Sequence, residues 1–153
     1  MRKRPRIGDI IEIKTRAGLA YAQFTHKVSL YGSLIRVLPK LYDVRPASFT
    51  ELVKLEERFF VFFPLTAAIH RGLVTIAGNE AVPERVQQFP LMRKAGAIDR
   101  SGKVLNWWLW DGEREWPILS LSPEEQQLSI ASIFNDTLLI ERIEAGWSPR
   151  DAV

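Results

Sequence analysis

The feature that most constrains the fold is a turn signal between two aromatic, strand-like runs in Val104–Leu119. Asp111-Gly112 lies between the runs, and Asp-Gly in such a position is a strong signal for a β-hairpin. A two-residue loop would place Trp107 opposite Trp116 and form a continuous apolar ladder. A four-residue loop would instead pair Leu109 with Trp116, which is less regular. We therefore predict the two-residue loop.

The two faces of this hairpin carry different side chains. Successive residues of a strand point to opposite faces, so Trp107 and Trp108 cannot share one core. Trp108, Trp110, Glu113 and Glu115 are predicted on the second face. One interpretation is that a helix covers this face and makes the sheet central to a larger core. The other is an exposed aromatic and acidic surface, which suits a protein partner better than phosphate-bearing nucleic acid.

Short apolar runs separated by Gly and Pro make up the rest of the chain. Strands are predicted over Ile7–Lys14, Leu19–Thr25, Tyr31–Leu38, Arg58–Phe63 and Leu73–Ala77, and Leu91–Lys94 can pair at an edge. Helices are predicted over Phe49–Glu57, between Pro64 and Gly72, after Ser122 and over Asp136–Gly146, where Leu138–Ile140 could instead form a strand. The sequence thus predicts an α+β fold, a strand-rich antiparallel sheet or small barrel with three to four short helices.

Charge and length indicate one domain with a basic leader. The 153 residues suit a single domain, and 21 Lys and Arg against 18 Asp and Glu give a net charge of +3. Four of the cations fall within the first six residues, and without them the 21 cations become 17 against 18 anions. We predict a disordered basic tail over residues 1–6 and a single α+β domain over 7–149. The tail could also serve as an arm on nucleic acid or anionic lipid.

The residues that usually carry catalysis or metal binding are sparse. The absence of cysteine excludes disulfides, thiol nucleophiles and cysteine-zinc sites. His26 and His70 lie far apart, and no phosphate loop or nucleophile elbow occurs. Glu113 and Glu115 could act as an acid and base pair, although such pairs are more often a solvated hairpin tip. We expect no enzyme, cofactor, metal or membrane span, and a cytoplasmic location.

Several segments resemble the immunity protein 26 family of bacterial toxin systems. The resemblance rests on Ile7–Ile13 with Gly8-Asp9, the turn Ala17-Gly18, the return Leu19–Gln23, Phe62-Phe63-Pro64-Leu65 with Ala68 and Gly72, the hairpin Trp107–Trp116, and Asn135-Asp136. It spans Ile7 to about Pro149. The resemblance implies a small α+β protein that binds and neutralises a cognate toxin without catalysis or a cofactor. No motif of the family fixes toxin-contacting residues in this sequence.

The residues predict a non-catalytic protein–protein interaction protein, and the family resemblance implies that it neutralises a cognate bacterial toxin. Its candidate partner-binding residues are Trp108, Trp110, Glu113 and Glu115. One alternative is a small β-barrel nucleic-acid-binding protein that uses the tail together with residues 21 and 36. Another is a domain that binds a small ligand in a deep pocket with convergent polar groups.

Overall fold

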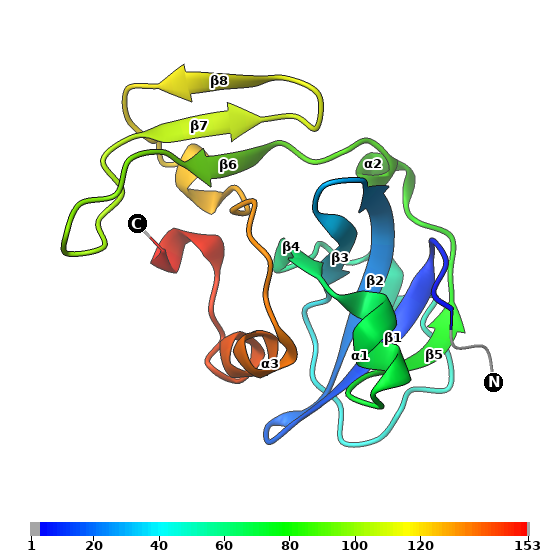
Figure 1. Ribbon diagram of the computed structural model, residues 1–153. Helices are drawn as coiled ribbons and strands as arrows, with labels where there is room; N and C mark the ends of the chain where they lie inside the picture. Colours follow the sequence, from blue (N-terminus) through cyan, green and yellow to red (C-terminus); the bar gives the residue numbers. More distant parts are fainter. Residues whose placement is uncertain (1–3, 153) are drawn as a thin grey trace.

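The computed structural model describes residues 4–152, which form two antiparallel sheets and short helices (Figure 1). The strands are β1 (Asp9–Thr15), β2 (Gly18–Val28), β3 (Gly32–Val37), β4 (Phe59–Phe63), β5 (Thr75–Asn79), β6 (Met92–Ala95), β7 (Trp107–Trp110) and β8 (Glu115–Ile118). The α-helices are α1 (Leu65–His70), α2 (Glu84–Gln87) and α3 (Asp136–Glu144), and the 3₁₀ turns are η1 (Leu52–Lys54), η2 (Glu125–Gln127) and η3 (Pro149–Asp151). The predicted α+β class is confirmed.

The larger sheet has the strand order β4-β3-β2-β1-β5 and is open, so the barrel alternative is wrong. Its central strands are buried on both faces because their apolar residues do not alternate with polar ones. On one face, Ile11 and Ile13 pack in a core shared with α1 and α3. On the other face, Ile10 and Tyr21 pack with Leu52 of η1. The helix α3 lies beside this sheet in Figure 1.

The smaller sheet, β6-β7-β8, is joined to the rest of the fold by residues 129–134. At its beginning this segment runs parallel to β6 and bonds to the free edge of that strand. The Arg93 N–H donates to the Ser129 carbonyl at 3.0 Å, and the Ala131 N–H donates back to the Arg93 carbonyl at 2.9 Å. The segment therefore acts as a short fourth strand of the smaller sheet.

The end of the same segment closes the free edge of β4. The Phe62 N–H donates to the Ser132 carbonyl at 3.1 Å, and the Phe134 N–H donates to the Phe62 carbonyl at 2.9 Å. Unpaired strand edges are open to pairing with another chain, so closing an edge removes that possibility. Residues 129–134 close one edge of each sheet. Within residues 4–152, the strands left at the outer edges are β5 and β8.

Side chains from both sheets meet in one aromatic cluster. Leu34 and Phe62 of the larger sheet pack with Met92 and Trp110 of the smaller one. The rings of Tyr31 and Trp110 are 5.1 Å apart between centroids. Because the cluster is continuous across the junction, the two sheets are packed together and are not merely joined by the chain.

The predicted two-residue hairpin loop is wrong. The structure pairs Leu109 with Trp116, which leaves a four-residue loop over 111–114. The Asp111 carboxylate accepts hydrogen bonds from the backbone N–H groups of Glu113, at 2.9 Å, and Arg114, at 2.7 Å. Gly112 has a φ of 100°. This Asx-type arrangement satisfies the loop backbone locally, which explains why the longer loop prevails over the apolar ladder.

The capping signals locate turns correctly but overestimate helix lengths. The Ser122 hydroxyl accepts from the Glu125 N–H at 3.2 Å, and the Glu125 carboxylate accepts from the Ser122 N–H at 2.9 Å, yet only the single turn η2 follows. At Ser48 the hydroxyl accepts from Thr50, and the predicted helix over Phe49–Glu57 is reduced to η1. The final helix is confirmed as α3, with the strand alternative excluded.

The chain start is held to the sheet from Arg6 onward. Residues 1–3 of the predicted tail 1–6 lie outside the described residues. The Arg6 N–H donates to the buried Asp9 carboxylate at 2.9 Å, and the Asn79 side-chain amide donates to the other carboxylate oxygen at 3.0 Å. These bonds fix the path of the backbone into β1.

A buried carboxylate on β1, that of Glu12, connects this strand to the long loop after β3. Glu12 accepts hydrogen bonds from the Tyr21 hydroxyl at 2.8 Å and from Arg45 at 2.8 and 3.1 Å. The Arg45 hydrogen bond is the main cause that lowers the pKa of Glu12 below its ordinary 4.5. Ionised Glu12 thus stabilises the fold above that value, and the contribution is lost as pH falls through the lowered folded-state pKa.

Replacing Glu12 with Gln is expected to make the protein less sensitive to acid. The variant should be less stable than the wild type near neutral pH, because Arg45 and Tyr21 lose an ionised partner. Its further loss of stability between about pH 6 and about pH 3 should be smaller than that of the wild type. Urea unfolding at both pH values measures this difference. Equal acid sensitivity of the two proteins would contradict the assigned role of Glu12.

Candidate functional site

The first candidate site is the predicted partner-binding face of the smaller sheet. The strand register places Trp108, Trp110 and Glu115 on one face, as predicted. β6 adds Met92 and Lys94 to that face. The change of loop length moves the pairing by two positions, and a shift of two leaves every side chain on its original face. Trp108, Trp110 and Glu115 therefore stay on the predicted face despite the wrong register, whereas Glu113, predicted on the same face, lies in the loop over 111–114.

The structure divides this face into a covered end and an open end. Trp110 is only 6% exposed, so it cannot contact a partner. The rings of Tyr31, Phe62 and Phe89 cover it, with centroids 5.1 to 6.2 Å from the indole. The covered interpretation is thus correct at this end, but loops and a strand of the larger sheet supply the cover, not a helix.

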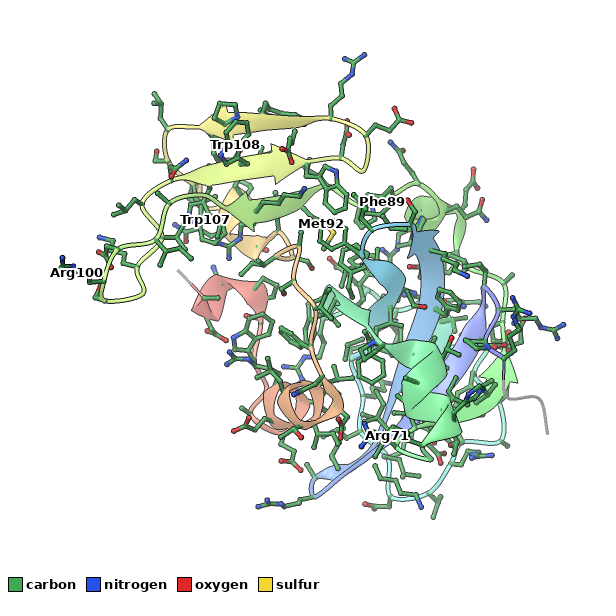
Figure 2. All side chains as sticks on the ribbon, in the orientation of Figure 1. Arg71, Phe89, Met92, Arg100, Trp107 and Trp108 are labelled. Atoms are coloured by element: carbon green, nitrogen blue, oxygen red, sulfur yellow. The ribbon has the colours of Figure 1, made fainter. Side chains whose placement is uncertain are left out.

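Trp108 occupies the open end of the face. Its side chain is half-buried, and its cross-strand neighbour Pro117 is exposed. Trp107 and Trp108 leave the sheet on opposite sides (Figure 2). Among the predicted site residues, Trp108 therefore remains the indole available to a partner.

Lys94 modifies the charge of the predicted acidic surface. Its ammonium lies 2.9 Å from the Glu115 carboxylate and 4.3 Å from the centroid of the Trp110 ring. Partial burial opposes the charged form, but hydrogen bonds to Glu115 and Tyr31 outweigh it and raise the pKa of Lys94. Glu115 is thus neutralised by a residue that carries no recognisable signal in the sequence.

Glu113 is the predicted acidic residue that keeps its charge available. It lies exposed in the loop over 111–114, and within residues 4–152 its carboxylate makes no hydrogen bond or ion pair. We use the name Trp108 surface for Trp108, Pro117, Glu113, Glu115 and Lys94. This surface is apolar at its centre, with one ion pair beside it and one unpaired carboxylate at the hairpin tip.

The opposite face of the smaller sheet is attached to the C-terminal segment. Arg93 is fully buried, and its guanidinium lies 4.3 Å from the centroid of the Trp107 ring. The guanidinium donates to the carbonyls of Leu128 at 3.1 Å, Gln126 at 3.2 Å and Pro149 at 2.6 Å. Burial lowers the pKa of Arg93. The side chain thus connects β6 to both η2 and η3.

A second buried arginine organises the loop before β4. Arg36 donates to the Gln23 side chain at 2.9 Å, to the Glu57 carboxylate at 3.1 Å, and to the carbonyls of Val53 and Leu55. Desolvation lowers the pKa of Arg36, opposed by the charge of Glu57. Arg36 is completely buried, and so is Tyr21. The nucleic-acid alternative is wrong at these two residues, because neither can reach a phosphate.

The second candidate site is a pocket of about 580 Å³ at the junction of the two sheets. Four segments line it, over residues 56–60, 90–91, 127–129 and 148–150. Its size lies in the ordinary range of small-molecule sites, about 300–1,000 Å³. The segments come from distant parts of the sequence, so no local motif could have revealed the pocket.

The histidines are not arranged as metal ligands. His26 bonds to the Gln87 carbonyl and to the Thr25 hydroxyl, each at 2.9 Å, and His70 is exposed in the last turn of α1. Residues 4–152 contain no group of three or more His, Cys, Asp or Glu side chains that could hold a metal ion. In the same part of the chain, no helix has both the length and the apolar character needed to cross a membrane.

Comparisons of the chain with family models, with curated proteins and with solved structures found no match. The immunity protein resemblance therefore stays a prediction. The functional argument rests on the Trp108 surface and the junction pocket.

Proposed function

We propose that the chain is a non-catalytic protein-binding module that uses the Trp108 surface. The observation that supports the proposal is the half-exposed Trp108 beside exposed Pro117, on a sheet whose outer strand β8 is an edge. Large indole side chains are enriched among the residues that dominate binding energy in protein interfaces. The partner suggested by the family resemblance is a cognate bacterial toxin, bound in the cytoplasm.

The charges around Trp108 indicate the chemistry of the partner. The Lys94–Glu115 pair is already satisfied, so the partner must supply apolar contacts there. Glu113 makes no ion pair within residues 4–152 and is exposed in the loop over 111–114, so it can receive a basic side chain. We therefore propose a protein surface that presents an apolar residue next to a lysine or arginine. Such complementarity directs partner choice more than it adds raw affinity.

Backbone pairing contributes little to this proposed interface. Pro117 has no N–H, and proline within a sheet is confined to edge strands. The edge strand β8 has only four residues. A partner strand paired with β8 would find no N–H donor at Pro117. Side chains must therefore provide most of the binding energy.

Replacing Trp108 with Ala is expected to weaken partner binding at least about thirtyfold, the effect of losing a contact worth about 2 kcal/mol. The partner is first captured from cells of the source organism with the wild-type chain, identified, purified and titrated. Trp116→Ala is the matched control, because Trp116 is a 39% exposed tryptophan on the opposite face of the same hairpin.

The control variant should bind the captured partner with unchanged affinity. A purified partner that binds the Trp108→Ala variant as tightly as the wild type would refute the surface assignment. A partner lost only in the Trp116→Ala variant would move the interface to the opposite face. Testing the partner for toxicity in cells with and without this chain then tests the neutralising role separately.

A further inference from the structure

We propose that the junction pocket binds a small organic carboxylate that has an apolar body. The site is separate from the Trp108 surface and does not depend on the protein-binding proposal. Three properties of the pocket support it: guanidinium groups with capacity for a ligand, an unused hydroxyl donor in the lining, and apolar walls. Each property is carried by residues from different segments that the fold brings together.

The charge balance around the pocket favours an anion. Glu57 lines the pocket, but its carboxylate is already held by Arg36 at 3.1 Å and by Arg85 at 3.0 Å. Arg36 and Arg85, which are not part of the lining, therefore both bind this one carboxylate. The lining itself holds two arginines, Arg58 and Arg150, and two glutamates, and Arg36 and Arg85 on Glu57 bring the guanidinium groups to four. An excess of one sign in a cleft raises the local concentration of ligands of the opposite sign.

The arginines on the wall have capacity for a ligand. One nitrogen of Arg58 donates to the Trp147 carbonyl at 3.2 Å. Because a carbonyl has no net charge, this contact does not neutralise the positive charge of Arg58. Within residues 4–152, the exposed side chain of Arg150 makes no hydrogen bond or ion pair. The carboxylate of Asp151, beside the pocket, accepts from the backbone of residue 148 at 2.9 Å. The remaining carboxylate of the wall, Glu56, is exposed to solvent.

Ser129 contributes a hydroxyl donor to the lining of the pocket. Ser129 is 7% exposed, and its hydroxyl oxygen accepts from the Phe60 N–H at 2.8 Å. A hydroxyl that accepts one hydrogen bond still has its own proton to donate. No acceptor for that proton is found among residues 4–152. A carboxylate oxygen of the ligand would accept this proton, and it would also accept hydrogen bonds from the guanidinium groups.

Apolar side chains of the lining require a ligand with an apolar body as well as a negative charge. Phe60 and Pro90 are half-buried on the wall, and Leu91 is 38% exposed. Leu128 is also part of the lining. A ring or a branched chain would cover these surfaces and remove them from water. Inorganic phosphate would meet the guanidinium groups but leave the apolar walls uncovered, so a monocarboxylate with a ring or branched chain fits the lining better.

The test uses paired probes of nearly the same shape, in which the amide replaces the charge and one acceptor oxygen of the acid by a neutral NH2 donor. Phenylacetate, benzoate and 4-methylpentanoate are each titrated against their own primary amides, with backbone amide NMR shifts of the full-length protein as the readout. The acids are expected to shift resonances of residues 56–60 and 127–129, and to bind at least about tenfold more tightly than the amides. Free leucine and inorganic phosphate are expected to bind more weakly than the acids.

Arg150→Gln is expected to weaken binding of the acids about tenfold and leave the amides unchanged. Arg100→Gln is the matched control, since Arg100 is an exposed arginine outside the pocket lining, in the loop before β7 (Figure 2). Trp108→Ala should bind the acids like the wild type, which keeps this test independent of the proposed function. Equal binding of acids and amides, shifts outside the pocket, or no binding by any acid up to about 10 mM would overturn the proposal.

Discussion

Replacing Arg93 with Met is expected to lower the free energy of unfolding by about 3 kcal/mol or more, because buried groups that lose their partner cost about 1–3 kcal/mol each. The guanidinium satisfies three carbonyls, those of Leu128, Gln126 and Pro149. Methionine has a similar length and fills much of the space, but it donates no hydrogen bond. Urea unfolding followed by tryptophan fluorescence measures the loss.

Two further variants separate the geometry of Arg93 from its charge. Arg93→Lys keeps the charge but lacks the planar fork, so it should also be strongly destabilised. Arg100→Met, at an exposed position, should change stability by less than about 0.5 kcal/mol. An Arg93→Met protein as stable as the wild type would show that η2 and η3 do not depend on this side chain. The attachment of the C-terminal segment would then need another cause.

Replacing Trp110 with Ala is expected to destabilise the protein by about 3–5 kcal/mol, the usual cost of truncating a buried aromatic residue. The substitution empties the centre of the cluster that joins the two sheets, where Tyr31 and Phe89 each lie 5.1 Å from the indole. It also removes the ring over which the Lys94 ammonium lies. Equilibrium urea unfolding measures the change.

Trp108→Ala is the control for this prediction. It removes the same side chain from the same face of the same strand, two positions away. Because Trp108 is half-exposed, its loss should cost clearly less than the loss of Trp110. If both substitutions cost the same, the division of this face into a covered and an open end is wrong. The Trp108 surface would then be part of the core.

The strands and their faces could be predicted because strand periodicity is local. Trp108, Trp110 and Glu115 were assigned to one face correctly although the hairpin register was wrong. A change of two positions in pairing does not alter which side a residue faces. The loop length depended on the Asp111 carboxylate, which satisfies two backbone N–H groups and outweighs the more regular pairing of apolar residues.

The coverage of these faces could not be predicted, because it depends on contacts between distant segments. Nothing in the sequence of residues 129–134 indicates that they close one edge of each sheet. Arginine is rarely buried, and no signal in the sequence marks Arg36 or Arg93 as a core residue. Their burial is possible only because backbone carbonyls from other segments surround each guanidinium. The same is true of the pocket and of the Lys94–Glu115 pair.

The capping signals predicted the positions of the helical segments correctly, but the predicted helices are longer than the observed ones. Asn135, just before the predicted first helical residue Asp136, accepts from the Leu138 N–H at 2.8 Å and is the N-cap of α3. Leu139 and Ile143 of that helix are buried, as their spacing predicts. The turn after Ser122 has a reciprocal Ser–Glu cap, yet η2 has three residues and none of them is buried. Packing, more than capping, therefore determines how far each helix extends.

The most direct test of the proposed function is hydrogen exchange of the full-length chain with and without its captured partner. The Trp108 surface predicts that backbone amides of residues 107–118 become protected on binding, while those of residues 56–60 and 148–150 around the pocket do not change. Protection confined to the pocket segments or to β5, with exchange in residues 107–118 unaltered, would contradict the account.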